Sequence, residues 1–362
     1  VQAQAQEVVI QGCGEEFADL AAIDCGNSGT TMRLLMGILA GRPGEYTLDG
    51  DESLRGRPME RVAEPLRLMG ATIKCSSGKC PVKISGGSLR GIDYDLPVAS
   101  AQLKSAVLLA GLQAEGRTTL KEPALSRDHT ERLLELMGGQ VSRSGRLWRV
   151  ERSRLSLPAS HLVPGDISSA AFFLCAAAII PGSQVRAEGV LLNPTRTGFL
   201  KVLRRMGAKV ELEVQDKRPE PVGRVRVAYS PHLTGCQITP AEIPLLVDEV
   251  PILSLVATQA QGVTVFQGVG ELRLKESDRL AALASQLGLL GAKVTAEADR
   301  LVVEGPTPLK GAPRLDSFAD HRLAMTLRLA SLMAGTETEI EGEASTAVSY
   351  PGFHDDLKRL SA

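Results

Sequence analysis

Aromatic residues are scarce in this sequence, and its charges nearly cancel. Phe, Trp and Tyr make up 3% of the 362 residues, so the hydrophobic cores must be built mainly from aliphatic side chains and methionine, and surfaces that stack nucleic-acid bases are disfavoured. The formal net charge is -1 at pH 7, so bulk electrostatics favour neither a nucleic acid nor an acidic membrane as a partner. A site for a small anion must therefore come from local clusters of basic residues.

Long apolar runs, paired cysteines and the common catalytic motifs are also missing. The longest apolar stretch, Ala170 to Pro181, is too short to cross a bilayer and is typical of a buried helix. The six cysteines show no Cys-x-x-Cys spacing, which favours reduced thiols in the cytoplasm. No Walker A run, H-E-x-x-H, G-x-S-x-G or Rossmann glycine motif occurs in a suitable context, so nucleotide-binding, zinc-protease and serine-hydrolase functions lack support.

The sequence does contain a repeat. A Leu-rich helical run, then Met-Gly or Leu-Gly, then a short strand recurs four times, and each glycine is expected at a helix C-terminus. These glycines are Gly70, Gly138, Gly207 and Gly291. A second series of polar residues opens apolar helical runs at Asn27, Ser100, Asp166, Asp248 and Asp320. The two series stay in step, which predicts α+β modules of about 70 residues, each with two helices and several strands.

The period also places the modules along the chain. Extrapolation backwards from Gly70 puts an earlier module boundary near residue 1, and residues 1–12 are expected to form a strand, a turn and a strand. Extrapolation forwards from Gly291 puts the end of a last helix near residue 359. We therefore expect six modules in two domains, residues 1–162 and 163–362, with the front of the first module, on the order of 65 residues, absent.

Several helix starts carry basic residues, and a helix N-terminus favours bound anions. The small residues Gly26 to Thr31 would let a ligand approach the backbone, with Arg33 one turn into the helix. Arg55 and Arg57 precede Pro58 and a further helix, an arrangement suited to holding a carboxylate or phosphate. A capped, closely packed helix and solvated arginines are the structural alternatives.

Three acidic and basic clusters lie at later helix starts. Lys275, Glu276, Asp278 and Arg279 fall within five residues, although a salt-bridged surface helix would give the same pattern. The start of the last long helix contains Asp320, His321 and Arg322, where His321 could be a capping partner. Asp248 and Glu249 open an apolar helix, and burial and nearby cations decide whether either acts as a base or only as a cap.

Taken in order, these segments resemble the enolpyruvyl transferases, and among them the shikimate-pathway branch. The resemblance runs from about Ala22 to Leu360. It rests on the segments GNSGTTMRLLMG, LDGDESLRGRPM, SAQLKSAVLLAG, SRDHTERLL, PGDISSAAFFL, VDEVPILSLVA, ELRLKESDRL, DHRLAM and VSYPGF. Nine such segments in sequence are far more specific than any one of them.

The resemblance implies an α+β fold with two domains, each an inside-out α/β barrel of three βαβαββ modules around a pseudo-threefold axis. Helix N-termini would converge on a cleft that closes on substrate. It further implies transfer of the enolpyruvyl group of phosphoenolpyruvate to the 5-hydroxyl of shikimate 3-phosphate, through a tetrahedral intermediate that loses phosphate. The two substrates are the only partners implied, for a cytoplasmic monomer without metal, organic cofactor, nucleic acid or membrane.

The resemblance also implies roles for individual residues. Asp248 would take the hydroxyl proton, and Glu276 would exchange protons at the methylene carbon. The residues matching the phosphoenolpyruvate site are Arg57, Arg279 and Arg322, and those matching the shikimate phosphate site are Ser100, Gln102 and Arg127. Lys275, like Gln102, lies in a substrate-contact segment. His321, beside Arg322, would orient rather than catalyse, and Gly29 would leave room for a phosphoenolpyruvate-mimicking inhibitor such as glyphosate.

The sequence departs from the family pattern in two places. A Pro-Gly-Asp-Lys-Ser-like loop with a substrate-binding lysine and arginine has no counterpart, and residues Pro164 to Ala170 have Ile167 at the lysine position. Val348 stands where some members have lysine. We therefore expect the chain by itself to be severely impaired. The alternatives are a UDP-N-acetylglucosamine enolpyruvyl transferase and an inactive fragment that binds ligand weakly.

Overall fold

The computed structural model describes residues 2–4, 7–9, 22–157 and 162–361. Contacts divide the chain into two compact units, which are described separately below. The first unit comprises residues 1–96, 102–121 and 138–155, and the second comprises residues 97–101, 122–137 and 156–362. The domain boundary expected between residues 162 and 163 stays a prediction.

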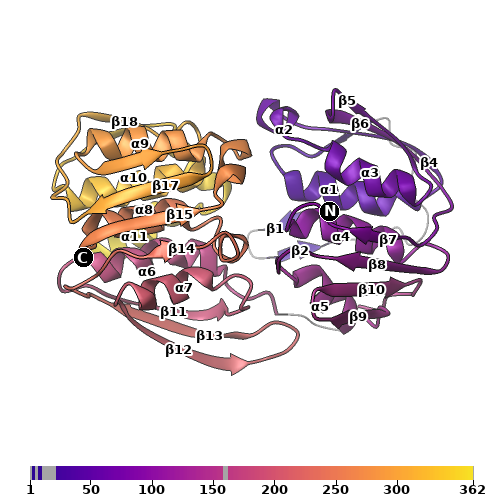
Figure 1. Ribbon diagram of the computed structural model, residues 1–362, viewed down its shortest axis with the longest axis horizontal. Helices are drawn as coiled ribbons and strands as arrows, with labels where there is room; N and C mark the ends of the chain where they lie inside the picture. Colours follow the sequence, from indigo (N-terminus) through magenta and orange to yellow (C-terminus); the bar gives the residue numbers. More distant parts are fainter. Residues whose placement is uncertain (1, 5–6, 10–21, 158–161, 362) are drawn as a thin grey trace. The chain divides into compact units, whose positions relative to one another are not determined.

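The fold is α+β and is built from a recurring βαβαββ module, as the sequence repeat indicated (Figure 1). In a complete module the first strand runs parallel to the second, and the third and fourth strands form a hairpin whose fourth strand pairs antiparallel with the second. The order across the sheet is therefore first, second, fourth, third. The connection between the parallel strands contains a helix, because parallel neighbours need a long crossover.

The helices and strands follow this order along the chain. An isolated hairpin comes first, formed by β1 (Gln2–Gln4) and β2 (Glu7–Val9). The next module contains β3 (Ile23–Asp24), α1 (Gly29–Ala40), β4 (Gly44–Asp49), the short α2 (Glu52–Gly56), α3 (Glu60–Leu68), β5 (Thr72–Ser76) and β6 (Lys79–Gly86). The one after it contains β7 (Asp93–Asp95), α4 (Ala101–Gly111), β8 (Arg117–Lys121), α5 (His129–Leu136), β9 (Val141–Ser144) and β10 (Leu147–Glu151).

Three further modules complete the chain. The first has α6 (Ile167–Ile179), β11 (Gln184–Leu191), α7 (Gly198–Arg205), β12 (Lys209–Asp216) and β13 (Val222–Ala228), with a single parallel bridge at Gly165 in place of a first strand. The second has β14 (Gln237–Ile238), η1 (Ile243–Leu245), α8 (Val250–Gln259), β15 (Gly262–Gln267), η2 (Gly270–Leu274), α9 (Arg279–Leu289), β16 (Lys293–Ala296) and β17 (Arg300–Gly305). The third has β18 (Arg314–Asp316), α10 (His321–Met333), β19 (Glu339–Glu341), η3 (Glu343–Val348) and α11 (Phe353–Ser361).

The four glycines of the repeat lie where they were expected. Gly70, Gly138, Gly207 and Gly291 each follow the C-cap residue of a helix and have φ values of 113°, 80°, 97° and 88°. At Gly207 the backbone N–H donates to Arg204 O (3.0 Å), and the next N–H donates to Leu203 O (2.9 Å). This is the Schellman arrangement, in which a left-handed residue satisfies the last carbonyl groups of the helix.

The expected helix starts are confirmed at three positions and are one residue early at two. Ser100 precedes α4, Asp166 caps α6, and Asp320 caps α10. At α1 the cap is Ser28, whose Oγ accepts from Thr31 N (3.0 Å), in place of Asn27. At α8 the cap position is Glu249 in place of Asp248, without a side-chain capping bond. In both cases the predicted residue, Asn27 or Asp248, instead contacts residues that are distant in sequence. A local pattern does not reveal such contacts.

In the second unit, buried helices form the interior and strands lie outside them. Helices α6, α8 and α10 contact one another (Figure 1). Nearly every residue of α6 and α8 is buried. A helix that is apolar on all sides is typical of such a position. On β13, Val225 and Val227 are buried and alternate with the more exposed Arg224 and Arg226, the period-two pattern of a half-buried strand.

In the first unit, α1 and α4 approach closely. A Cβ atom at Gly37 of α1 would lie 2.1 Å from the carbonyl oxygen of Ala106 on α4, so only glycine fits there. The N-termini of α1 and α4 also lie side by side, as the hydrogen bond between Gln102 and Thr30 shows (2.7 Å). No helix within the described ranges is long and apolar enough to span a membrane.

Candidate active site

The second unit contains a partly buried carboxylate surrounded by cations. Asp248, just before α8, has a side chain that is 14% exposed. Its Oδ2 atom lies 2.5 Å from Arg127 Nη2 and 3.7 Å from Arg322 Nη2, and its Oδ1 atom lies 3.7 Å from Arg279 Nη1. Residues far apart in the sequence, on three different modules, therefore meet at one carboxylate.

The charges around Asp248 determine its protonation state. Burial alone would raise the pKa of Asp248, but the attraction of Arg322, Arg127, Lys275 and Arg279 outweighs burial and holds the pKa well below its ordinary value. The carboxylate is therefore ionised throughout the physiological range. An ionised carboxylate can accept a proton from a hydroxyl group, which is the chemical requirement for a general base.

The neighbouring acid, Glu249, has the opposite electrostatic environment. The residue is 1% exposed, and its buried Oε1 atom has no hydrogen-bond partner among the described residues. Burial and then repulsion from Asp248 raise the pKa of Glu249, and Arg322, Arg127 and Arg196 only partly oppose this. Two adjacent carboxyl groups thus have pKa values that are pushed apart, a pattern that is common in catalytic sites.

We expect the variant Glu249→Gln to gain stability over the wild type as the pH rises. Because the pKa of Glu249 is raised in the folded state, the folded chain keeps a proton that the unfolded chain loses above about pH 4.3. Folding of the wild type therefore becomes less favourable above that pH, whereas glutamine has no proton to lose. Thermal unfolding measured from about pH 4 to about pH 8 tests this. Glu339→Gln, at an exposed position of β19, is the control, and a Tm difference that stays constant with pH would contradict the expectation.

Arg279 is the most buried cation of the site. It begins α9, its side chain is 1% exposed, and its Nε atom lies 2.7 Å from Asp320 Oδ2 while its Nη2 atom lies 2.7 Å from Glu276 Oε2. The attraction of Asp320 and then of Glu276 outweighs burial and keeps the pKa of Arg279 above its ordinary value. The pattern from Lys275 to Arg279 is therefore not a solvent-exposed salt bridge, the structural alternative that the sequence left open.

Asp320 connects two helix starts. Its carboxylate is completely buried, caps α10 by accepting from Arg322 N (2.9 Å), and binds Arg279 on α9. Burial alone would raise the pKa of Asp320, but Arg279 lowers it below the ordinary value. His321, the next residue, has a pKa lowered by burial and then by Arg322. The cap and the ion pair together fix where Arg279 and Arg322 point.

A further arginine of this cluster was not predicted from the sequence. Arg196, in the turn before α7, donates to Asp166 Oδ1 (2.9 Å) and Ser168 Oγ (2.6 Å) at the start of α6. Burial and then the positive charge of Arg127 lower the pKa of Arg196. The available signal was a basic residue in a short strand-to-helix turn, beside a helix start of the same module. Lys275, whose pKa is lowered by burial, completes the cations around Asp248.

The first unit contains a second cluster of cations, at the N-terminus of α1. Arg57 donates to Asn27 Oδ1 (2.9 Å) and Ser53 Oγ (3.1 Å), and Arg33 donates to Pro58 O (3.1 Å). A Cβ atom added to Gly29 would lie 3.2 Å from Arg33 Nη1 and 3.5 Å from Arg57 Nη1. Two guanidinium groups thus converge on a helix N-terminus at a position without a side chain, which is favourable for a small anion.

The other predicted residues of this region differ in their surroundings. Gln102, on the first turn of α4, accepts from Arg33 and donates to Thr30. Ser100 lies directly before the same helix, and its backbone N–H donates to Val98 O (2.9 Å). Arg55, which was predicted together with Arg57 to hold an anion, instead pairs with Asp49 through Nη2 and Oδ2 (2.5 Å). Its side chain is 58% exposed. Of the two arginines, only Arg57 faces the α1 N-terminus.

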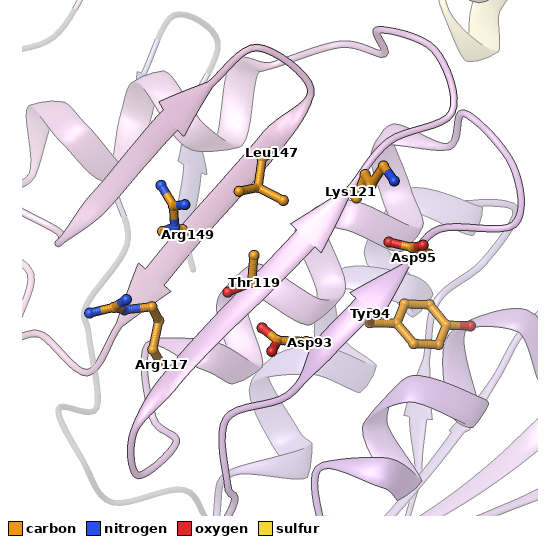
Figure 2. Close-up of a pocket in the computed structure, with 8 residues that line it drawn as sticks. All are labelled: Asp93, Tyr94, Asp95, Arg117, Thr119, Lys121, Leu147 and Arg149. Carbon is orange, nitrogen blue, oxygen red and sulfur yellow. The ribbon is translucent and has the colours of Figure 1, made fainter.

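A separate hollow of about 720 Å³ lies on the exposed face of the sheet β7–β8–β10–β9 (Figure 2). Neighbouring strands place Asp95 beside Lys121 and Thr119 between Asp93 and Arg149. Its acidic groups lie on β7 and its basic groups on β8 and β10, and none of the predicted site residues lines it. Among the described residues, no group of three or more His, Cys, Asp or Glu side chains could hold a metal ion. The cysteines in the described ranges are free thiols, and Cys13 lies outside those ranges.

Comparison with known proteins shows what this chain is similar to. A model of the family described as EPSP synthase (3-phosphoshikimate 1-carboxyvinyltransferase) matches residues 1–357. A 3-phosphoshikimate 1-carboxyvinyltransferase from Bacillus licheniformis is 45% identical over 366 residues, covering 100% of this chain and 85% of the relative. One from a Synechococcus species is 50% identical over 364 residues, covering 98% of this chain and 81% of the relative.

Solved structures show the same similarity. EPSP synthase from Acinetobacter baumannii has a TM-score of 0.82 and 42% sequence identity, with 95% of this chain and 79% of that chain covered. The enolpyruvyl transferase NikO from Streptomyces tendae has a TM-score of 0.69 over 84% of this chain and 71% of that chain. At 21% identity, the second comparison shows the fold alone.

Proposed function

The chain belongs to the EPSP synthase family, the 3-phosphoshikimate 1-carboxyvinyltransferases, and on this premise we propose which of its residues carry out the reaction. The enzyme transfers the enolpyruvyl group of phosphoenolpyruvate to the 5-hydroxyl of shikimate 3-phosphate. Addition forms the bond between the 5-oxygen and C2 of phosphoenolpyruvate, and elimination then breaks the bond from C2 to the phosphate oxygen. Of the two acceptors that the sequence left open, shikimate 3-phosphate is thus the substrate.

The observation that carries the proposal is the position of Asp248 among Arg127, Lys275, Arg279 and Arg322. Asp248 accepts the proton of the 5-hydroxyl as the new bond forms. In the substrate-free chain these cations hold the pKa of Asp248 low, which makes it a weak base. Both substrates bring phosphate, and phosphoenolpyruvate also brings a carboxylate. Their negative charge offsets the cations and moves the pKa of Asp248 towards the range in which a base is effective.

We assign the second proton transfer to Glu276. Addition also places a proton on the methylene carbon, and elimination removes a proton from the resulting methyl group. The Glu276 side chain is 21% exposed and is oriented by its hydrogen bond to Arg279. A carboxyl group that is held in place but still accessible can give and take the same proton in the two half-reactions.

The cations serve as the anion sites of this proposal. Arg279, Arg322 and Arg57 bind phosphoenolpyruvate, since planar guanidinium groups match both carboxylate and phosphate geometry. Arg127, with Ser100 and Gln102, binds the phosphate of shikimate 3-phosphate, and Lys275 contacts substrate beside Asp248. We also propose that the enzyme works in the cytoplasm, where free thiols such as those described here are stable. Its partners are the two substrates only, and it acts as a monomer.

The variant Gly29→Ala tests this assignment. Phosphate release should require both shikimate 3-phosphate and phosphoenolpyruvate, and the variant should raise the KM for phosphoenolpyruvate by on the order of 10-fold. The reason is that its Cβ atom would lie 3.2 Å from Arg33 Nη1, where the small anion is proposed to approach. Gly87→Ala is the matched control, because a Cβ atom there would meet nothing within 4 Å. An unchanged KM for phosphoenolpyruvate in Gly29→Ala would remove the α1 N-terminus from the proposed site.

A further inference from the structure

A buried amide with fully satisfied hydrogen bonds lies outside the proposed site. Asn193, two residues after β11, is 0% exposed. Its Nδ2 atom donates to Asp128 Oδ1 (2.7 Å) and Glu220 Oε2 (2.8 Å), and its Oδ1 atom accepts from Thr195 N (2.8 Å) and Thr195 Oγ1 (2.7 Å). An amide side chain has two N–H donors and one oxygen with two lone pairs, so Asn193 uses its entire capacity here.

Asn193 connects three segments of the second unit that are distant in sequence. Asp128 belongs to residues 122–137, Thr195 to the turn before α7, and Glu220 to the loop between β12 and β13. The Arg132 Nε atom forms ion pairs with both carboxylates, 3.0 Å from Asp128 Oδ1 and 3.6 Å from Glu220 Oε2. His129 Nδ1 lies 2.6 Å from Glu220 Oε1. The two carboxylates are 4% and 6% exposed. Without the Asn193 amide, the buried Asp128 and Glu220 carboxylates would each lose a hydrogen bond, which costs free energy of folding.

The connected segments carry two of the cations described above. Arg127 directly precedes Asp128, and its guanidinium group contacts Asp248. The backbone N–H of Arg196 donates to the backbone oxygen of Asn193 (2.8 Å), and the Arg196 side chain contacts Asp166 and Ser168. The Asn193 side chain therefore holds Asp128, the neighbour of Arg127, in place. The Asn193 backbone oxygen holds the backbone of Arg196.

We propose that Asn193 is a positioning residue that sets the place of Arg127 for the phosphate of shikimate 3-phosphate. The inference rests on the proposed function, because Arg127 must bind that phosphate. Asn193 itself touches no reacting atom. It acts through the backbone, so its loss displaces the Arg127 guanidinium group without removing a charge. This distinguishes it from a residue whose removal only loosens the interior.

Calorimetric titration of shikimate 3-phosphate into the purified chain tests the inference. Asn193→Leu, which is close in shape but makes no hydrogen bonds, should bind shikimate 3-phosphate about 10- to 100-fold more weakly, as expected for a displaced charge-assisted contact. The KM for shikimate 3-phosphate should rise by the same factor, whereas kcat and the KM for phosphoenolpyruvate should change less than about threefold. Gln286→Leu is the control, because Gln286 is also a buried amide of the second unit and accepts from Asp316 N (2.8 Å). It should lower the Tm and leave the affinity unchanged.

A double-mutant cycle with Arg127→Met gives a readout that a purely structural role would not produce. If Asn193 acts through Arg127, Asn193→Leu should cause little further loss of affinity in the Arg127→Met background. Additive losses, or normal affinity of Asn193→Leu beside a weakened Arg127→Met, overturn the inference and leave the proposed function intact. A wild-type chain that does not bind shikimate 3-phosphate, or Arg127→Met that binds it normally, overturns the proposed phosphate site and the inference with it.

A milder variant decides the question if Asn193→Leu does not fold. Thr195→Val removes only the hydroxyl that donates to Asn193 Oδ1 and preserves the shape of the side chain. We expect shikimate 3-phosphate to bind about threefold more weakly to this variant, again without an effect in the Arg127→Met background. Unchanged affinity in Thr195→Val overturns the inference.

Discussion

Replacing Asp248 by asparagine should lower kcat on the order of 10²- to 10⁴-fold, the usual contribution of a general base. Asparagine preserves the size of the side chain but cannot accept the hydroxyl proton. The KM values for the two anionic substrates should stay the same or fall, because Arg127, Arg279 and Arg322 lose their shared counter-ion. Phosphate release measured over a range of both substrate concentrations separates the two parameters.

The control for this variant is an acid of the same unit on the surface. Asp355→Asn, on the exposed side of α11, should leave both kinetic parameters unchanged. A decrease of kcat smaller than about 10-fold in Asp248→Asn would assign the base to another residue. A large increase in KM with normal kcat would show that Asp248 only orients the arginines.

Replacing Arg279 by methionine should destabilise the second unit by about 3–5 kcal/mol, the cost of removing one partner from a buried ion pair. Methionine fills much of the space of the arginine stem but leaves Asp320, which is 0% exposed, without its cation. Urea unfolding followed by circular dichroism measures the loss. Adding Asp320→Leu to Arg279→Met should recover part of it, because the uncompensated buried charge is then removed as well.

The chain offers a matched control for the Arg279 variant. Arg300 and Glu297 form an ion pair with the same spacing in sequence as Arg279 and Glu276, but their side chains are 48% and 47% exposed. Exposed pairs contribute about 0–1 kcal/mol, so Arg300→Met should have little effect on unfolding. Equal destabilisation by the two substitutions would mean that burial is not what makes Arg279 important.

The features that local chemistry specifies were predictable from the sequence. The glycines at 70, 138, 207 and 291 follow helix C-caps because a left-handed backbone conformation strongly favours glycine. From these positions the module period and the α+β class followed directly. The helix starts were predicted to within one residue, since a polar residue before an apolar run is a local signal. At Ser28 and Glu249 the neighbouring Asn27 and Asp248 took a role in longer-range contacts instead.

The features that depend on contacts between distant segments were not predictable in the same way. Nothing in the local pattern around Arg279 distinguishes a buried cation from one on a surface helix, because the burial comes from α10 and Asp320. Arg196 and Asn193 lie in a short turn that resembles an ordinary connection, and the carboxylates that they bind are 27 to 65 residues away. Their roles follow from the way in which modules pack, which a period along one chain does not specify.

The strand order within the sheets has a consequence for how the chain is made. Among the described residues, each sheet pairs strands of one module only, and in every sheet of three or four strands the last two strands in sequence form a local hairpin. Pairing residues that are close in sequence costs little loop-closure entropy, so a module can close its sheet soon after its last strand leaves the ribosome. The contacts among α6, α8 and α10 form later, because they need three modules. The sheets can therefore fold one after another during translation. The helical interior of the second unit assembles only after α10 has been synthesised.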